Sequence, residues 1–231
     1  MKLPFWATSL TILGVFILCS LGSWQLERLA WKEDLITKIQ AAYAQENPTD
    51  IVFDHEAPEF TYGRIEGEFL ADKAFLLGPP KMRDDVAGLE LIVPVKMNRH
   101  TVLVNMGWTP HALTEQPIHH LNGKRIAFTG LLRFFSYNAF TPDNKPEDEV
   151  WYQLDVPLIA ASKSLEDLYP AALIAERANY KFDAAFFGDD RSAEVRALPN
   201  NNHMQYALFW FAMAGALIVV YALRFIKTPK A

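Results

Sequence analysis

The sequence predicts a membrane protein of the α+β class, with a transmembrane helix at each end of a β-rich antiparallel extramembrane domain that contains short helices. Two charge-free runs, residues 3–26 and 200–223, predict the transmembrane helices. The alternation of polar and apolar side chains between them predicts strands. We expect four parts: an N-terminal transmembrane helix (residues 1–26), the β-rich domain (27–199), a C-terminal transmembrane helix (200–226) and a short tail (227–231).

Each charge-free run is long enough to cross a bilayer. About 20 helical residues, rising 1.5 Å each, cover a hydrocarbon core about 30 Å thick. Signal peptides have a shorter apolar region, and the first run continues past the weak cleavage pattern Ser20-Leu21-Gly22 into Trp24. We therefore expect an uncleaved span, with cleavage as the alternative. Cys19, the one cysteine of the chain, lies within this span and leaves no internal disulfide.

Helical spacing continues beyond the first span. Trp24, Arg28 and Trp31 recur at intervals of three and four residues, so we expect the helix to run on in water to about residue 40. Trp24 and Trp31 fit the aromatic belt at a membrane boundary.

The middle of the chain predicts a sheet. Residues 62–70 alternate, and two apolar runs flank a turn at residues 98–100, which indicates a hairpin. Asn122-Gly123 is typical of a turn that opens a strand. The strands expected are residues 62–70, 89–97, 101–108 and 125–135, with shorter ones at 151–154 and 174–180. The helices expected are residues 156–163 and 165–173, the second capped by Ser164.

Charges predict the orientation in the membrane. Basic residues near short tails favour the cytoplasmic side, and the ends carry Lys2, Arg224, Lys227 and Lys230. Arg28 and Lys32 argue mildly for the opposite orientation. No Arg-rich or Ser-rich transit peptide precedes the first span, so we expect a multi-pass protein of a bacterial inner membrane. Its central domain would be periplasmic and both termini cytoplasmic.

The central domain is acidic. Residues 27–199 contain all 27 acidic side chains and 18 of the 22 basic ones, a net charge of −9. Such a balance argues against nucleic acid as a partner, because phosphate backbones are bound by basic surfaces.

The start of the second span carries a candidate haem site. Asparagines at residues 200–202 are strong helix caps and place His203 in the first turn, at the outer membrane edge. Tyr206 and Trp210 share its helix face. A neutral imidazole above aromatic walls and a floor of Ala207 and Ala214 is a plausible place for a haem iron and its flat ring. The alternative is an interfacial histidine without a ligand.

The first span carries a second set of candidates. Residues at helical spacing form a stripe along one face of this span, and the stripe ends in Gln25 and Arg28, beside Trp24. Gln25 and Arg28 would face the same membrane edge as His203. Arg28 could bind a carboxylate such as a haem propionate. Alternatively, Arg28 and Lys32 anchor the helix among lipid headgroups. The stripe consists of Gly14, Leu18, Leu21, Gln25 and Arg28.

Signs of catalysis are absent from the sequence. It contains no GxSxG, no HExxH and no phosphate-binding glycine loop. The adjacent carboxylates are typical of a solvated surface, and the other histidines lack the spacing of a zinc site. We expect no catalytic residues and no enzyme activity.

Six blocks of sequence carry a resemblance to a known family. They are Leu21-Gly22-x-Trp24-Gln25-x-x-Arg28-x-x-Trp31-Lys32; Gly78-Pro79-Pro80; Val102-Leu103-Val104-Asn105-Met106-Gly107-Trp108-x-Pro110; Gly130-Leu131-Leu132-Arg133; Phe140-Thr141-Pro142-x-Asn144 with Trp151 and Asp155; and Asn201-Asn202-His203-Met204-Gln205-Tyr206-Ala207-x-x-Trp210. Together they resemble the Surfeit locus protein 1 family of cytochrome c oxidase assembly factors.

The resemblance implies a helper in the maturation of subunit I of haem–copper oxidases, acting with other assembly factors. Some bacterial members bind haem a, and His203 matches the haem-linked histidine of the family. Met106 stands where the family usually has Arg, which leaves the role of a charge in that strand open. Phe209 replaces a usual Thr and Pro199 a usual basic residue.

Three hypotheses follow. In the first, the protein binds haem a, with His203 as an axial ligand, Tyr206 and Trp210 lining the ring, and Arg28 at a propionate. In the second, a haem-free scaffold holds subunit I during cofactor loading, and the contacts between helices or with the partner are Trp24, Gln25, His203 and Gln205. In the third, the outer domain acts on a periplasmic substrate, but only its clustered acids motivate this.

Overall fold

The computed structural model describes residues 4–44, 48–53, 59–83, 85–110, 118–135, 137, 139–180, 182 and 198–225. The chain divides into two units, which are described separately. The first comprises Met1–Lys38 with Pro199–Ala231, and the second Ile39–Leu198.

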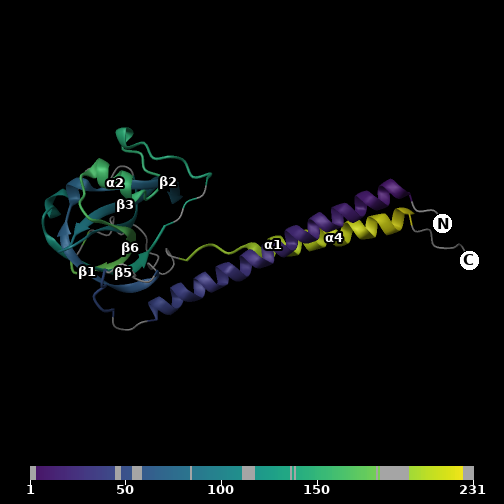
Figure 1. Cartoon of the computed structure of the whole chain (residues 1–231), viewed down its shortest axis with the longest axis horizontal. Helices are drawn as coiled ribbons and strands as arrows, with labels where there is room; N and C mark the ends of the chain where they lie inside the picture. The colour runs from purple at the N-terminus through teal and green to yellow at the C-terminus, as the bar shows by residue number, and fades with distance from the viewer. Residues whose placement is uncertain are drawn as a thin grey trace, which may run out of the picture. The chain divides into compact units, whose positions relative to one another are not determined.

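The first unit is an antiparallel pair of helices, α1 (Phe5–Tyr43) and α4 (His203–Phe225) (Figure 1). Near the start of α1, the hydroxyl groups of Thr8 and Tyr221 are hydrogen-bonded at 2.6 Å. At the other end of the pair, Gln25 is hydrogen-bonded to His203, the first residue of α4. Because the beginning of one helix meets the end of the other, the two run in opposite directions.

Small residues allow the two helices to approach closely. A Cβ placed on Gly22 would lie 2.7 Å from the Phe211 ring, and one on Gly14 would lie 2.9 Å from Leu217. On α4, Ala207 and Ala214 are only 1% and 4% exposed. Close backbone approach at small residues is the usual way in which helices pack within a membrane.

The outer surface of the helix pair is apolar. Both helices are long and apolar enough to cross a membrane, and few of their residues are buried. A helix in the core of a soluble protein would bury such side chains, whereas these are suited to lipid. The predicted fold class, a membrane α+β protein, is confirmed. The apolar side chains more than half exposed include Phe5, Trp6, Leu10, Ile12, Phe16, Leu208, Phe209, Val219, Val220 and Leu223.

Helix α1 continues well past its apolar run, as the spacing of its tryptophans predicts. Its 39 residues correspond to about 58 Å at 1.5 Å per residue. The last turn belongs to the second unit, where Ile39 and Ala42 are buried. There the Tyr43 ring packs against Tyr62, with 5.0 Å between the ring centroids.

The second unit is built on a six-stranded sheet in the order β1-β5-β6-β4-β3-β2. The end of β1 also pairs with the end of β3, so five strands close on themselves and β2 extends from β3. The strands are β1 (Thr61–Phe69), β2 (Phe75–Arg83), β3 (Val86–Lys96), β4 (Thr101–Pro110), β5 (Arg125–Arg133) and β6 (Leu168–Ala178).

Two hydrophobic clusters cover the two faces of the sheet. The inner cluster fills the space enclosed by the closed strands and includes Val93, Val104 and Phe128. The outer cluster includes Ile92, Leu103 and Trp151, and helix α2 (Val156–Lys163) covers it through the buried Ile159. Neighbouring residues along β3 and β4 belong to opposite clusters, as the period of two requires.

Several predicted elements are confirmed. The hairpin at residues 98–100 joins β3 to β4, with Lys96 paired to Thr101. Gly123, with φ of 78°, precedes β5 as the Asn-Gly turn indicates. Helix α2 has the predicted bounds, and the Asp155 carboxylate caps it by accepting a hydrogen bond from the Leu158 N–H.

The helix predicted at residues 165–173 is wrong. Ser164 ends α2 in a left-handed conformation, with φ of 50°, and most of the segment belongs to β6. This strand lies between β4 and β5 and contributes side chains to both clusters, so both of its faces are buried and its sequence is a nearly continuous apolar run. Periodicity cannot distinguish such a run from a buried helix. The pairing with β4 is parallel, so the sheet is mixed rather than wholly antiparallel.

Two further differences concern the edge of the sheet. Strand β2 was not predicted, because it contains Gly78-Pro79-Pro80; proline is tolerated in a strand only at an edge or bulge. The strand predicted at residues 151–154 is reduced to a single bridge from Trp151 to Leu77. The next two residues are held instead by the Asn144 side chain, which accepts hydrogen bonds from their N–H groups.

Candidate functional site

The candidate site lies where α4 begins, beside residue 25 of α1. Helix α4 starts at His203, directly after the asparagine run, as the capping pattern predicts. The Tyr206 N–H donates to the Asn202 carbonyl at 3.4 Å and closes the first turn. His203 is therefore held at the end of a regular helix, with its imidazole turned toward α1.

The imidazole of His203 is oriented by a side chain of the other helix. Its Nδ1 lies 2.6 Å from Oε1 of Gln25. Because an amide oxygen can only accept, Nδ1 donates and carries the ring proton. The lone pair of the neutral ring is then on Nε2, which is the nitrogen able to bind a metal ion. The hydrogen bond thus selects one tautomer and one direction of the ring.

A second contact joins the helices near the same end. Nζ of Lys32 donates to the Asn200 carbonyl oxygen at 2.5 Å. Lys32 follows Gln25 by seven residues, so the two side chains share one face of α1. The sequence predicted only that Lys32 anchors the helix among lipid headgroups. It predicted Arg28 as the residue that shares a helix face with Gln25. Leu18, Gln25 and Lys32 follow one another at intervals of seven residues, about two helical turns. This spacing in the sequence could have indicated that Lys32 lies on the same helix face as Gln25.

The structure places the other α1 candidates on exposed surface. The guanidinium carbon of Arg28 lies over the Trp31 ring, 4.9 Å from its centroid, and Arg28 is exposed. Trp24 is also about half exposed. Gln25 is thus the predicted α1 residue that contacts His203, while Arg28 and Trp24 lie beside the contact and do not form it.

The aromatic candidates of α4 differ in exposure. Tyr206 is 55% exposed, whereas Trp210 is half-buried and its ring packs edge-on against Phe209 at 5.3 Å. Ala207 and Ala214, expected as the floor beneath a flat ring, are both buried within the helix pair. Small buried residues of this kind serve close helix packing, so they do not form an open floor.

The chain matches one protein family over most of its length. The profile of the SURF1 family matches residues 12–215. A SURF1-like protein of Rickettsia bellii is 30% identical over 233 residues, covering 93% of this chain and 89% of the relative. A SURF1-like protein of Monosiga brevicollis is 28% identical, covering 87% and 80%.

A further relative is named Surfeit locus protein 1, from Rattus norvegicus. It is 24% identical over 232 residues, covering 90% of this chain and 72% of the relative. The family match includes the whole sheet unit and the contact between Gln25 and His203. The resemblance found in the six sequence blocks is thereby confirmed: the chain belongs to the SURF1 family, and this membership implies a role in the assembly of cytochrome c oxidase.

Proposed function

We propose that this protein binds haem a at His203, at the outer face of a bacterial inner membrane, and assists the maturation of oxidase subunit I. The observation that carries the proposal is the hydrogen bond from His203 Nδ1 to Gln25, which leaves the Nε2 lone pair for an iron ion. Metal-binding histidines commonly donate their other ring N–H to a neighbouring acceptor in this way.

Apart from the alanine floor, the side chains at this end of the helix pair are of types that suit a haem. Haem a, when bound, would supply an iron that takes an imidazole as an axial ligand. His203 would be that ligand, and Tyr206 and Trp210 would line the ring. Arg28 is exposed and cationic, so it can meet a propionate carboxylate. Trp24 would complete the apolar surroundings at the membrane edge.

Gln25 is a positioning residue in this proposal. Its amide oxygen holds the imidazole proton on Nδ1 and fixes the plane of the ring. Loss of such an outer partner typically weakens metal affinity 10- to 100-fold. We therefore expect Gln25→Ala to weaken haem binding while leaving the ligand in place.

The proposed orientation in the membrane combines the same helix pair with the charges at the chain ends. If both antiparallel helices span the bilayer, Phe5 and Phe225 lie on one side and His203 on the other. Arg224, Lys227 and Lys230 after the second span favour the cytoplasm for the first of these sides. Periplasmic labelling of a single cysteine at position 203, in a Cys19→Ser background, would support this orientation, and cytoplasmic labelling would overturn it.

Absorption spectra test the ligand assignment. The protein would be purified from cells that make haem A, as wild type and as His203→Ala, Gln25→Ala and His119→Ala. His119 lies in the sheet unit and serves as the matched control. We expect a haem spectrum in the wild type and in His119→Ala, a weaker one in Gln25→Ala and none in His203→Ala. An unchanged spectrum and stoichiometry in His203→Ala would refute the assignment.

A co-purification experiment separates the haem-free scaffold. An interhelical hydrogen bond also serves a protein that only holds subunit I. Subunit I would be co-purified from cells with and without haem A synthesis. Dependence of the complex on haem A supports the first function, whereas equal recovery from both strains supports the scaffold.

A further inference from the structure

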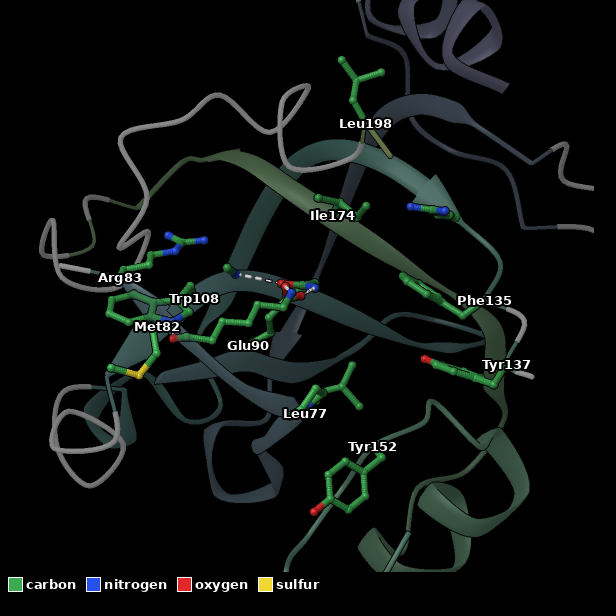
Figure 2. Close-up of a pocket in the computed structure, with 16 residues that line it drawn as sticks. Leu77, Met82, Arg83, Glu90, Trp108, Phe135, Tyr137, Tyr152, Ile174 and Leu198 are labelled. Atoms are coloured by element: carbon green, nitrogen blue, oxygen red, sulfur yellow. Dashed lines mark hydrogen bonds and ion pairs between the residues drawn. The ribbon is translucent and has the colours of Figure 1, made fainter. Parts of the chain in front are cut away.

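A cavity of about 600 Å³ lies on the outer face of the sheet, within the second unit (Figure 2). Its size is typical of sites that bind small organic molecules. Five strands contribute to it, through Leu77 of β2, Glu90 of β3, Asn105 of β4, Arg133 of β5 and Ile174 of β6. The cavity adjoins the outer cluster, because Leu77 belongs to both.

A β-bulge shapes one wall of the cavity. In the pairing of β3 with β4 the register shifts at Leu91, and Gly107 has φ of 100°. Met106 belongs to the inner cluster. Side chains of a regular strand alternate between its two faces, so without the bulge Trp108 would also point into the interior. The extra residue of the bulge turns Trp108 to the outer face instead, where its indole N–H donates to the Lys81 carbonyl at 2.9 Å.

The floor of the cavity is polar, although the sheet surface next to it is apolar. Asn105 is buried and donates to Glu90 at 2.5 Å, while its side-chain oxygen accepts from the Gly107 N–H at 2.8 Å. The other carboxylate oxygen of Glu90 pairs with Lys81 at 2.5 Å. Burying a polar group opposes folding unless it is paired, and here the buried Asn105 side chain is paired through both its nitrogen and its oxygen.

The walls carry cations held against aromatic rings. The guanidinium of Arg83 lies over Trp108 at 4.9 Å, and that of Arg133 over Phe135 at 5.6 Å. Figure 2 shows Arg83 and Trp108 on one side, Phe135 and Tyr137 on the other, and Glu90 between them. Stacking engages the face of a guanidinium, whereas anions are recognised by its N–H edge, so the two contacts are compatible.

The charge of the cavity opposes that of its domain. Among the lining residues that the structure describes, three are cationic, Lys81, Arg83 and Arg133, and one is anionic, Glu90. Residues 27–199 together carry −9. Burial raises the pKa of Tyr137, whose hydroxyl accepts a hydrogen bond from the Leu154 N–H at 3.0 Å.

From this geometry we infer that the cavity binds a small organic anion with a flat aromatic or apolar body. The anionic group would lie at Arg83 or Arg133, and the body against Trp108, Phe135 and Tyr152. Guanidinium groups recognise carboxylates and related anions through paired N–H donors. The site belongs to the sheet unit alone and is independent of haem binding at His203.

Two dyes with the same ring system test the inference. The full chain in zwitterionic nanodiscs would be titrated with 8-anilinonaphthalene-1-sulfonate and with N-phenyl-1-naphthylamine, which lacks the sulfonate. Protein from cells without haem A synthesis would be used, with empty nanodiscs as background. We expect saturable 1:1 binding of the anionic dye and at least tenfold weaker binding of the neutral dye at this site.

Charge substitutions locate the site. At least one of Arg83→Gln and Arg133→Gln, the one that removes the arginine at the anionic group, is expected to weaken binding of the anionic dye about tenfold, and the Lys variant at that position less. Arg125→Gln, at the exposed start of the same strand β5, is the matched control and should keep wild-type affinity. Unchanged affinity in both cavity variants, or equal binding of the two dyes, would overturn the inference. Circular dichroism would verify that each variant is folded.

Discussion

The helix pair and the sheet unit use polar side chains in different places. In the pair, the hydrogen bonds between helices lie near the ends, from Thr8 to Tyr221 and from Gln25 to His203, and small residues pack between them. In the sheet unit, the network of Glu90 and Asn105 lies in the middle of the outer face. Both arrangements bring a few polar groups to a defined place on an otherwise apolar surface.

This difference follows from the solvent of each region. A bilayer solvates apolar side chains, so the pair has no hydrophobic driving force and depends on close packing. Water favours burial of apolar area, so the sheet unit is stabilised chiefly by its clusters. Substitutions of the two kinds of contact should therefore have very different effects.

The largest loss of stability is expected when a side chain in the interior of the sheet unit is truncated. Phe128 is 0% exposed and packs against the rings of Phe69 and Phe182. Phe128→Ala should lower the free energy of unfolding of this unit by about 3–5 kcal/mol. Urea unfolding followed by near-UV circular dichroism measures it, and Phe140→Ala, at a position 95% exposed, is the control. A loss as small as that of the control would mean that the inner cluster does not stabilise the sheet.

The next effect concerns a polar contact within the same unit. The Tyr62 hydroxyl donates to the Glu176 carboxylate and accepts from Arg177 at 3.3 Å. Tyr62→Phe should cost about 1.5–3 kcal/mol, the range for hydrogen bonds to charged groups. The same urea titration checks this. Tyr152→Phe, which removes a tyrosine hydroxyl elsewhere in the sheet unit, is the control; an equal loss there would contradict a specific role of the Tyr62 hydroxyl.

The Tyr62 contact also predicts a pH dependence. Burial, with the neighbouring Glu176, raises the pKa of Tyr62 above its usual value of about 10 in the folded state. The folded state then holds the phenol proton more tightly than the unfolded state. This stabilisation is full below about pH 10 and is lost as the pH rises through the folded pKa. Alkaline titration at a wavelength where phenolate absorbs, with Tyr62→Phe as reference, should show a late-titrating phenol; titration at the ordinary pKa would contradict it.

A smaller effect is expected from overpacking the helix pair. Gly22→Val would place a side chain against Phe211 and should destabilise the pairing by about 1–3 kcal/mol. Gly215→Val is the control, since a Cβ added at Gly215 would have no atom within 4 Å. In a Cys19→Ser background, cross-linking of cysteines at positions 8 and 221 reports the pairing. Equal cross-linking of the two variants would disprove close contact at Gly22.

The smallest effect is expected from the contact between Gln25 and His203. Hydrogen bonds between helices in a membrane average about 0.6 kcal/mol, so Gln25→Ala should scarcely change the cross-linking yield. A double-mutant cycle with His203→Ala measures the coupling between the two residues. If Gln25→Ala weakens haem binding strongly but leaves the pairing intact, the contact serves the ligand; a collapse of the pair would assign it to structure instead.

The sequence alone determined the features that depend on neighbouring residues. The charge-free runs predicted both apolar helices, the asparagine run predicted a helix start that places His203 in the first turn, and the Asn-Gly pair predicted the turn before β5. Hydropathy, caps and tight turns act within a few residues, so the chain carries them locally. The six blocks also identified the family, because they join uncommon residue types at fixed spacing.

Only the tertiary structure decided which distant segments meet. It made residues 168–178 a central strand rather than a helix, and it joined Lys32, not Arg28, to the segment before α4. It also assembled the cavity from five strands, with a bulge that turns Trp108 outward. Strand partners, bulges and helix seams depend on contacts between residues far apart in the chain, which no local pattern specifies.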